Sequence, residues 1–388
     1  MEQALSGFTV LDFGRYIPGP YAAMLLAEQG AEVIKIEPPG GDPARGHPAF
    51  RVFNRSKRGL VLDLKKQAGR EAAQALAAKA DVLVQNFRPG AAERLGLGYE
   101  ALRGLNPRLV YLAITGFGPA GPYRDIAGWE PLVGAVSGVH VEQGGRGSLP
   151  PAYIVLPLSS YYAAFMAAYA VTIALYAREK TGRGQRVDIS LLGAILAASS
   201  GLMLNFEGQI RIPFTGSQGV SPIYRLYQGS DGQWFFLALG NLTFFAKFAL
   251  LIERVDWLDD PLFEGAPFLI LPPRNEQATA MIQEIFLTRT RDEWLKILRE
   301  ADIPCAPAQP VETYMDDPQV EANEMVLSIE EPDLGRVRQM GVPVRLDMMP
   351  GRVLGRAPRL GEHSRDILSG LLGWGDDRIE TLRKEGVI

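Results

Sequence analysis

The first 130 residues of the chain alternate apolar, β-branched runs with segments of helical pattern, and this alternation constrains the fold more than any other feature. Strand-like runs occupy residues 8–13, 32–36, 60–64, 81–84 and 109–114, and helical patterns occupy residues 19–29 and 67–79. Strands that consist of continuous apolar residues are typical of a parallel sheet that is covered on both faces. The sequence therefore predicts an α/β fold assembled from βαβ units.

The whole chain has 388 residues, which is too long for one ordinary core. The sequence pattern changes in the second half of the chain. Residues 224–227 and 234–238 flank Asp231-Gly232 and predict a hairpin. Residues 291–301 predict an amphipathic helix. We expect a large domain at residues 1–200 and 326–388, a linker at 201–222, and a smaller α+β domain at 223–325.

The carboxyl-terminal tail has too little apolar material to form a core of its own. Residues 342–346 are strand-like and residues 361–370 are helical. Because a lone strand and helix cannot bury their own apolar faces, we expect the tail to pack against the first domain.

Bulk properties exclude several classes of protein. A net charge of −4, with scattered basic residues, does not favour nucleic acid or an anionic membrane as partner. The first residues do not resemble a secretory signal, and the apolar stretch 161–176 is shorter than the roughly 20 residues of a membrane span, so we interpret it as a buried helix. The single Cys305 fits a reducing cytoplasm, and His47, His140 and His363 have no metal-ligand spacing, so we expect no metal.

Short motifs follow one another in a fixed order along nearly the whole chain. They are PGP at 18–20, EVIKIEPPG at 32–40, LDLK at 62–65, NFRPG at 86–90, RLGL at 94–97, KTGRGQ at 180–185, IPCAP at 303–307 and LGEH at 360–363. Together they resemble the CaiB/BaiF-like family III CoA-transferases. The resemblance implies a Rossmann-like large domain completed by the tail, a smaller domain between, and two chains threaded through each other as an interlocked dimer.

The resemblance also implies a site for coenzyme A or acyl-CoA. Phosphates, adenine and a thiol arm require local cations, backbone donors and an apolar surface. The family positions are Tyr16, Ile17, Pro38, Leu62, Lys65, Asn86, Phe87, Arg88, Arg94 and Leu95. Taken alone, Lys65 and Arg88 could equally be solvated loop charges. The segment 181–185 lacks the lysine-serine ending of a phosphate loop and is expected to be a packed turn.

The chemistry of the family requires an aspartate that attacks the acyl-CoA and then carries CoA as a thioester. Alignment with the family places this position at Ser160, at Ser159 or, with a shift, at Pro157, and no aspartate occurs between Asp125 and Asp188. The histidine and aspartate of the related racemases would fall at Trp129 and at the same serines. Glu130 remains: it could orient the substrate, replace the nucleophile, or be an ordinary loop glutamate.

Three hypotheses follow from these residues. The chain could be the subunit without a nucleophile in a two-component transferase, paired with a homologous subunit that keeps its aspartate, as in the benzylsuccinate CoA-transferases. It could be an enzyme of altered mechanism that isomerises or transfers an acyl group. It could be a homodimeric acyl-CoA-binding protein without catalysis. The small acid that would accept CoA is not specified, although Tyr16, Ile17 and Trp129 hint at an apolar or aromatic group.

Overall fold

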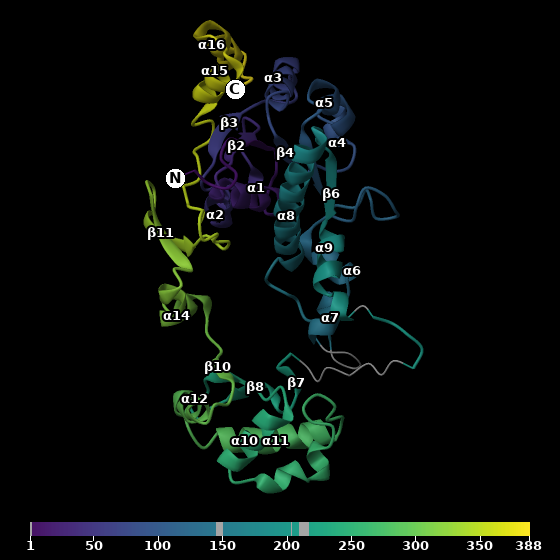
Figure 1. The fold of residues 1–388 in the computed structure, drawn as a ribbon, viewed down its shortest axis with the longest axis vertical. Helices are drawn as coiled ribbons and strands as arrows, with labels where there is room; N and C mark the ends of the chain where they lie inside the picture. Colours follow the sequence, from purple (N-terminus) through teal and green to yellow (C-terminus); the bar gives the residue numbers. More distant parts are fainter. Residues whose placement is uncertain (1, 145–149, 203, 209–216) are drawn as a thin grey trace. The chain divides into compact units, whose positions relative to one another are not determined.

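A computed structural model describes residues 2–144, 150–202, 204–208 and 217–388, and the chain divides into two compact units (Figure 1). Unit 1 consists of Met1–Ser137, Leu156–Met203 and Gln319–Ile388, and unit 2 of Gly138–Val155 and Leu204–Pro318. The domain limits drawn from the sequence stay a prediction, and part of the expected linker at 201–222 lies outside the described residues.

Unit 1 contains a six-stranded parallel sheet in the order β3-β2-β1-β4-β5-β6. The strands are β1 Thr9–Asp12, β2 Glu32–Glu37, β3 Arg58–Val61, β4 Val82–Gln85, β5 Val110–Thr115 and β6 Arg186–Ser190. The predicted α/β class is confirmed, and β3 begins two residues earlier than expected. The strand order reverses between β1 and β4, and ligands of such sheets bind at the carboxyl ends beside that reversal.

Helices cover both faces of this sheet (Figure 1). The helices of the sheet and its connections are α1 Pro18–Glu28, η1 Pro43–Gly46, α2 Ala49–Phe53, α3 Gln67–Ala77, α4 Ala91–Arg94, α5 Tyr99–Leu105, α6 Glu130–Val136, α8 Leu158–Thr181, α9 Leu191–Ala198 and η2 Ser200–Leu202. Leu11, Ile34 and Leu83 belong to a core shared with α3 and α5. Because strand side chains alternate, their neighbours point to the opposite face, where α1 packs on β1, β2 and β4, and α8 on β5 and β6.

Helix α8 is the core helix expected from its alanine-rich sequence, but it is longer than predicted. It has 24 residues and is, within the described ranges, the one helix long and apolar enough to cross a membrane, so the argument from its short length was wrong. Ala163, Ala167 and Val171 are fully buried, whereas Tyr169 and Tyr176 on another face are exposed. The helix ends at Gly182, whose φ of +69° is the left-handed conformation that glycine favours. Segment 181–185 is thus a helix-ending turn, as expected.

The tail packs on unit 1, as predicted, but its local structure differs from the prediction. It forms α15 Ser364–Leu372 and α16 Asp376–Lys384, whose Ile367 and Ile379 join the core of the sheet. The predicted strand at 342–346 was wrong, because Pro343 has no amide hydrogen to donate to a ladder and the carbonyl of Val344 accepts from the Gln29 side chain. The strands of the tail are instead an antiparallel ribbon of β11 Val326–Glu331 and β12 Gly335–Met340.

Unit 2 is built around an antiparallel sheet in the order β10-β9-β8-β7. Its strands are β7 Gly219–Ser221, β8 Tyr224–Gln228, β9 Trp234–Ala238 and β10 Cys305–Pro307. Its helices are α7 Val139–Gly144, α10 Leu242–Leu251, η3 Val255–Leu258, η4 Pro261–Phe263, α11 Arg274–Phe286, α12 Arg291–Glu300 and α13 Val311–Tyr314. Helix α14, Pro318–Ala322, begins at the last residue of unit 2 and continues in unit 1. The predicted hairpin and amphipathic helix are confirmed.

Candidate functional site

A pocket of about 540 Å³ opens at the carboxyl ends of the parallel strands of unit 1. Its volume is in the usual range for small-molecule sites. Segments that follow five strands form its walls: Tyr16 and Ile17 after β1, Pro43, Ala44 and His47 after β2, Asn86 to Pro89 after β4, Thr115 and Gly116 at the end of β5, and Leu191 after β6. The pocket therefore lies where the strand order predicts a ligand, beside the reversal between β1 and β4.

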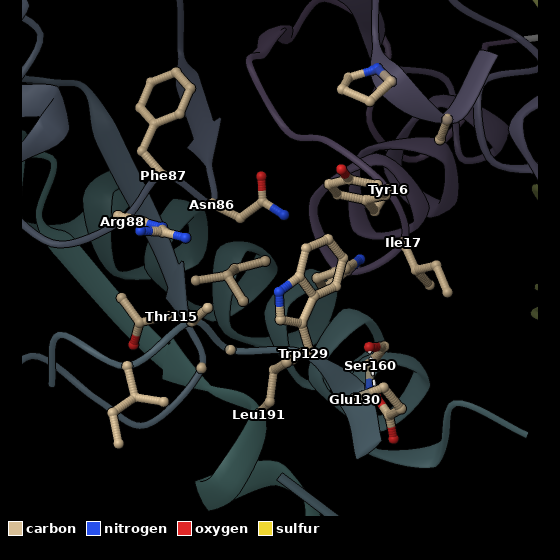
Figure 2. Close-up of a pocket in the computed structure, with 18 of the residues that line it drawn as sticks. Tyr16, Ile17, Asn86, Phe87, Arg88, Thr115, Trp129, Glu130, Ser160 and Leu191 are labelled. Atoms are coloured by element: carbon tan, nitrogen blue, oxygen red, sulfur yellow. Dashed lines mark hydrogen bonds between the residues drawn. The ribbon is translucent and has the colours of Figure 1, made fainter. Parts of the chain in front are cut away.

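The turn after β4 brings three of the predicted residues, Asn86, Phe87 and Arg88, to the pocket. The Gln85 side chain accepts a hydrogen bond from the Phe87 amide at 2.7 Å and holds the start of this turn. Gly90, at φ +79°, then reverses the chain into α4. Figure 2 shows the Arg88 guanidinium directed toward the other labelled side chains. A planar cation at a strand end is suited to a phosphate or carboxylate of a ligand.

The loop between β1 and α1, residues 13–17 (the β1–α1 loop), supplies Tyr16 and Ile17. The Asn86 side chain binds both backbone groups of Arg15, accepting from its amide at 2.8 Å and donating to its carbonyl at 2.9 Å. Tyr16 has φ +60°, a left-handed conformation that costs free energy for a residue with a side chain. Its ring stands edge-on to Trp129, with centroids 5.3 Å apart. These two rings form an apolar wall of the pocket.

A close contact between two glycines brings Trp129 to this wall. A Cβ on Gly116 would lie 2.3 Å from the Cα of Gly128, so side chains are sterically excluded at that crossing. Figure 2 shows the Trp129 indole in the middle of the labelled residues, with Leu191 and Thr115 nearby. Sequence reasoning missed Thr115, Gly116 and Leu191, and the only available signal was the position of Thr115 directly after the predicted strand 109–114.

Glu130 is the first residue of α6, and its carboxylate lies at the amino terminus of α8, where it accepts four hydrogen bonds. Its Oε1 accepts from the Ser159 amide at 2.8 Å, and its Oε2 from the Ser160 amide at 2.9 Å and from both serine hydroxyls at 2.6 Å. A carboxylate satisfies the unpaired amides of a helix start and is stabilised by the helix dipole. Glu130 is half-buried, and it is the one carboxylate among the described residues that line the pocket.

Two aspects of the electrostatics of the pocket follow from this arrangement. Burial raises the pKa of Tyr161, and the nearby Glu130 carboxylate raises it further, so this phenol stays protonated beside the helix start. The pocket is also lined by His47, Arg88 and Arg124, of which Arg124 lies 3.9 Å from Asp125. The pocket thus contains one carboxylate and two guanidinium groups.

The structure does not bring every predicted residue to the pocket. Those outside it are Pro38, Leu62, Lys65, Arg94, Leu95 and Ser159. Leu62 is buried in the core and Leu95 packs against that core, whereas Lys65 and Arg94 are exposed. Ser159 is almost fully buried behind Glu130, while Ser160 reaches the pocket surface. The assignment of all these residues to a CoA site stays a prediction.

Comparison with known proteins identifies the class. The model of CoA-transferase family III matches residues 5–364. The alpha subunit of a succinyl-CoA–L-malate CoA-transferase from Chloroflexus aurantiacus is 32% identical over 401 residues, covering 99% of this chain and 92% of the relative. The beta subunit from the same species is 30% identical over 398 residues, covering 99% and 98%. A CAIB/BAIF family protein from Brucella suis superposes with a TM-score of 0.81 at 28% identity, covering 96% of this chain and 100% of that one.

The chain therefore belongs to CoA-transferase family III, as its motifs predicted. Proteins of this class act on CoA thioesters, so the pocket at the strand ends is the candidate site for such a substrate.

Proposed function

We propose that this chain binds acyl-CoA in the pocket of unit 1 and moves CoA to a carboxylic acid as the subunit without a nucleophile in a two-component transferase. One observation carries the proposal. The two serines at the start of α8, where the family resemblance places the nucleophile, are both donors to Glu130. The position thus contains hydroxyls, and the neighbouring carboxylate is already engaged as the cap of the helix.

A serine cannot take over the role of the family's aspartate. The carboxylate attacks the thioester carbonyl and the C–S bond breaks, which gives a mixed anhydride and a free CoA thiolate. The thiolate then attacks the enzyme carbonyl of the anhydride, which breaks its C–O bond, releases the donor acid as a carboxylate and leaves an enzyme thioester. A serine would give an oxygen ester, which the thiolate cannot open to an enzyme thioester. In addition, no described histidine lies within the hydrogen-bond network of Ser159 and Ser160, so neither hydroxyl has an evident base other than Glu130.

The names of the relatives support a pairing of homologous subunits. Both the alpha and the beta subunit of the succinyl-CoA–L-malate CoA-transferase resemble this chain over nearly its whole length. A transferase composed of two family members is therefore compatible with this family. The partner of this chain would be a homologous subunit with an aspartate at the start of its equivalent helix.

A second candidate function is transfer by the chain alone, with Glu130 as the nucleophile. The observation that favours it is that Glu130 is the one carboxylate on the described pocket surface. Its Oε1 accepts a single hydrogen bond and keeps a free lone pair, whereas Oε2 accepts three. Attack through Oε1 would give the same anhydride and thioester sequence on this chain.

The test is CoA exchange followed by mass spectrometry with a panel of acyl-CoAs and free acids. The purified chain is assayed alone, with a homologous subunit encoded beside it, and with that subunit after its aspartate is changed to alanine. Exchange only with the intact partner is the expected result. Borohydride, which reduces an enzyme thioester to an alcohol, would then modify the partner's aspartate.

Two outcomes would contradict the proposal in different ways. Exchange by the chain alone, with borohydride modification of Glu130, would establish the second candidate. Absence of exchange in every mixture, with tight CoA binding, would leave a binding protein without catalysis.

A further inference from the structure

Four charged side chains are buried together beneath the pocket, and none of them reaches it. Asp12, Lys35, Asp42 and Lys57 are between 0% and 5% exposed. Lys57 Nζ lies 2.7 Å from Asp12 Oδ2, and Lys35 Nζ lies 3.1 Å from Asp42 Oδ2. Burying charges is costly even when they are paired. Their bonds to backbone groups indicate what the network does.

The network binds both backbone groups of Gly14 in the β1–α1 loop. Asp12 Oδ1 accepts from the Gly14 amide at 2.8 Å, and the Lys35 ammonium donates to the Gly14 carbonyl. The next residue, Arg15, is held on both backbone groups by Asn86. Side chains thus fix two successive residues immediately before Tyr16, whose strained φ of +60° needs such support.

The same network holds a second wall of the pocket. Asp42 Oδ1 accepts from the Ala44 amide at 2.9 Å and caps η1, whose Pro43 and Ala44 line the pocket. The amide of Asp42 itself donates to Glu37 at the end of β2. Lys35 and Asp42 therefore connect the β1–α1 loop to η1 through one buried ion pair.

We propose that Lys35 and Asp42 are positioning residues for the ligand, because they hold the two walls that contain Tyr16 and Ala44 in one fixed arrangement. If the ion pair contributed only to fold stability, apolar side chains of similar volume would stabilise the fold equally well, because replacing a buried ion pair in that way is often neutral or stabilising. An ion pair is needed here because the Gly14 carbonyl requires a donor and the Ala44 amide an acceptor. The inference rests on the proposal that this pocket binds CoA.

The test variant is Lys35→Met/Asp42→Leu, which removes the pair without leaving a lone buried charge. The matched control is Glu28→Leu/Arg55→Met, which removes a second ion pair of unit 1, 2.5 Å long, that is equally buried and does not line the pocket. CoA affinity is measured by calorimetry well below the unfolding midpoint of each protein. We expect the test variant to bind CoA about tenfold more weakly, which corresponds to about 1.4 kcal/mol, and the control to bind within about twofold of the wild type.

Amide hydrogen exchange supplies a second readout that a merely structural role would not change. In the test variant, exchange in peptides covering residues 13–17 should accelerate, while exchange in β1 and β4 should not. Unchanged CoA affinity and unchanged exchange in the test variant would overturn the inference. A wild-type chain that does not bind CoA would contradict the proposed function instead, and the exchange measurement would still decide whether the pair holds the loop.

Discussion

The pocket has two walls that depend on charged side chains, and they use charge in opposite ways. On the side of the β1–α1 loop, the charges are fully buried and bind the backbone of Gly14, while Tyr16 and Ile17 of the same loop reach the pocket. On the side of α8, the carboxylate of Glu130 is itself on the pocket surface. The first wall can position a ligand but cannot react with it, whereas the second contains a group capable of chemistry.

The difference also concerns how each wall would tolerate change. Removing one partner of a buried ion pair leaves an unpaired charge, whereas removing Glu130 leaves only neutral amide and hydroxyl donors without an acceptor, and an uncharged group costs less to leave unpaired than a charge. The comparison therefore predicts large effects on stability at the first wall and smaller effects at the second.

The largest effect is expected for Lys57→Met. The substitution leaves Asp12 charged and unpaired in a site with no exposure, and removing one partner of a buried pair typically costs about 3–5 kcal/mol. Urea unfolding measures the loss. The control is Arg186→Met, which removes a pair with Asp188 that is more than a third exposed and should cost less than about 1 kcal/mol. If both variants lost the same free energy of unfolding, burial would not make the pair of Lys57 and Asp12 more important to stability than an exposed pair.

Glu130→Ala is expected to cost about 2 kcal/mol, because α8 loses its cap and two hydroxyls lose their acceptor. Glu130→Gln keeps one acceptor oxygen and should cost about half as much. Thermal unfolding of both variants, with the isosteric Glu130→Gln as the control, tests whether the alanine variant is the less stable of the two. If the alanine variant were as stable as the wild type, Glu130 would have no role as a cap.

A smaller effect is expected from pH. Burial lowers the pKa of Lys57 to about 8, opposed by Asp12 and Asp42 and assisted by the like charge of Lys35. Above pH 8 the folded protein loses this proton while the unfolded chain keeps it up to its ordinary value of 10.5, so the unfolded state binds more protons. Stability should therefore rise, relative to Lys57→Met, by about 1 to 2 kcal/mol between pH 8 and 10. If the stability of the wild type relative to Lys57→Met decreased between pH 8 and 10, the prediction would be wrong.

The sequence predicts the parallel sheet, because its strands are visible as local apolar patterns. Apolar runs mark β1 to β5, and the resemblance identifies Asn86, Phe87 and Arg88 at a strand end. The contacts that shape the pocket are long-range and leave no such pattern. Glu130 caps a helix that begins 28 residues later, and Gly116 and Gly128 touch through a loop crossing.

A sequence pattern also does not show which charged side chains are buried. Lys35 lies between apolar residues in a strand that begins and ends with glutamate, and its neighbours in the sequence do not show whether it is buried or solvated like Lys65. Only the fold shows that Lys35 is fully buried against Asp42 and that Lys65 is exposed outside the pocket. The prediction that placed Lys65 in the site rested on family resemblance, and the motif at residues 32–40 that contains Lys35 did not indicate that this lysine is buried.

The smallest effect on stability is expected for Tyr16→Gly, although the same substitution should clearly affect ligand binding. Glycine adopts the φ of +60° without strain, which favours the folded state, but it loses the contact of the ring with Trp129 and increases the entropy of the unfolded chain. These terms oppose one another, so the free energy of unfolding should change by less than about 1 kcal/mol. CoA affinity, measured by calorimetry, should nevertheless fall because one wall is lost. Tyr16→Phe, which keeps the ring and the strain, should bind as the wild type does; weaker binding by the phenylalanine variant would assign the role to the hydroxyl instead of the wall.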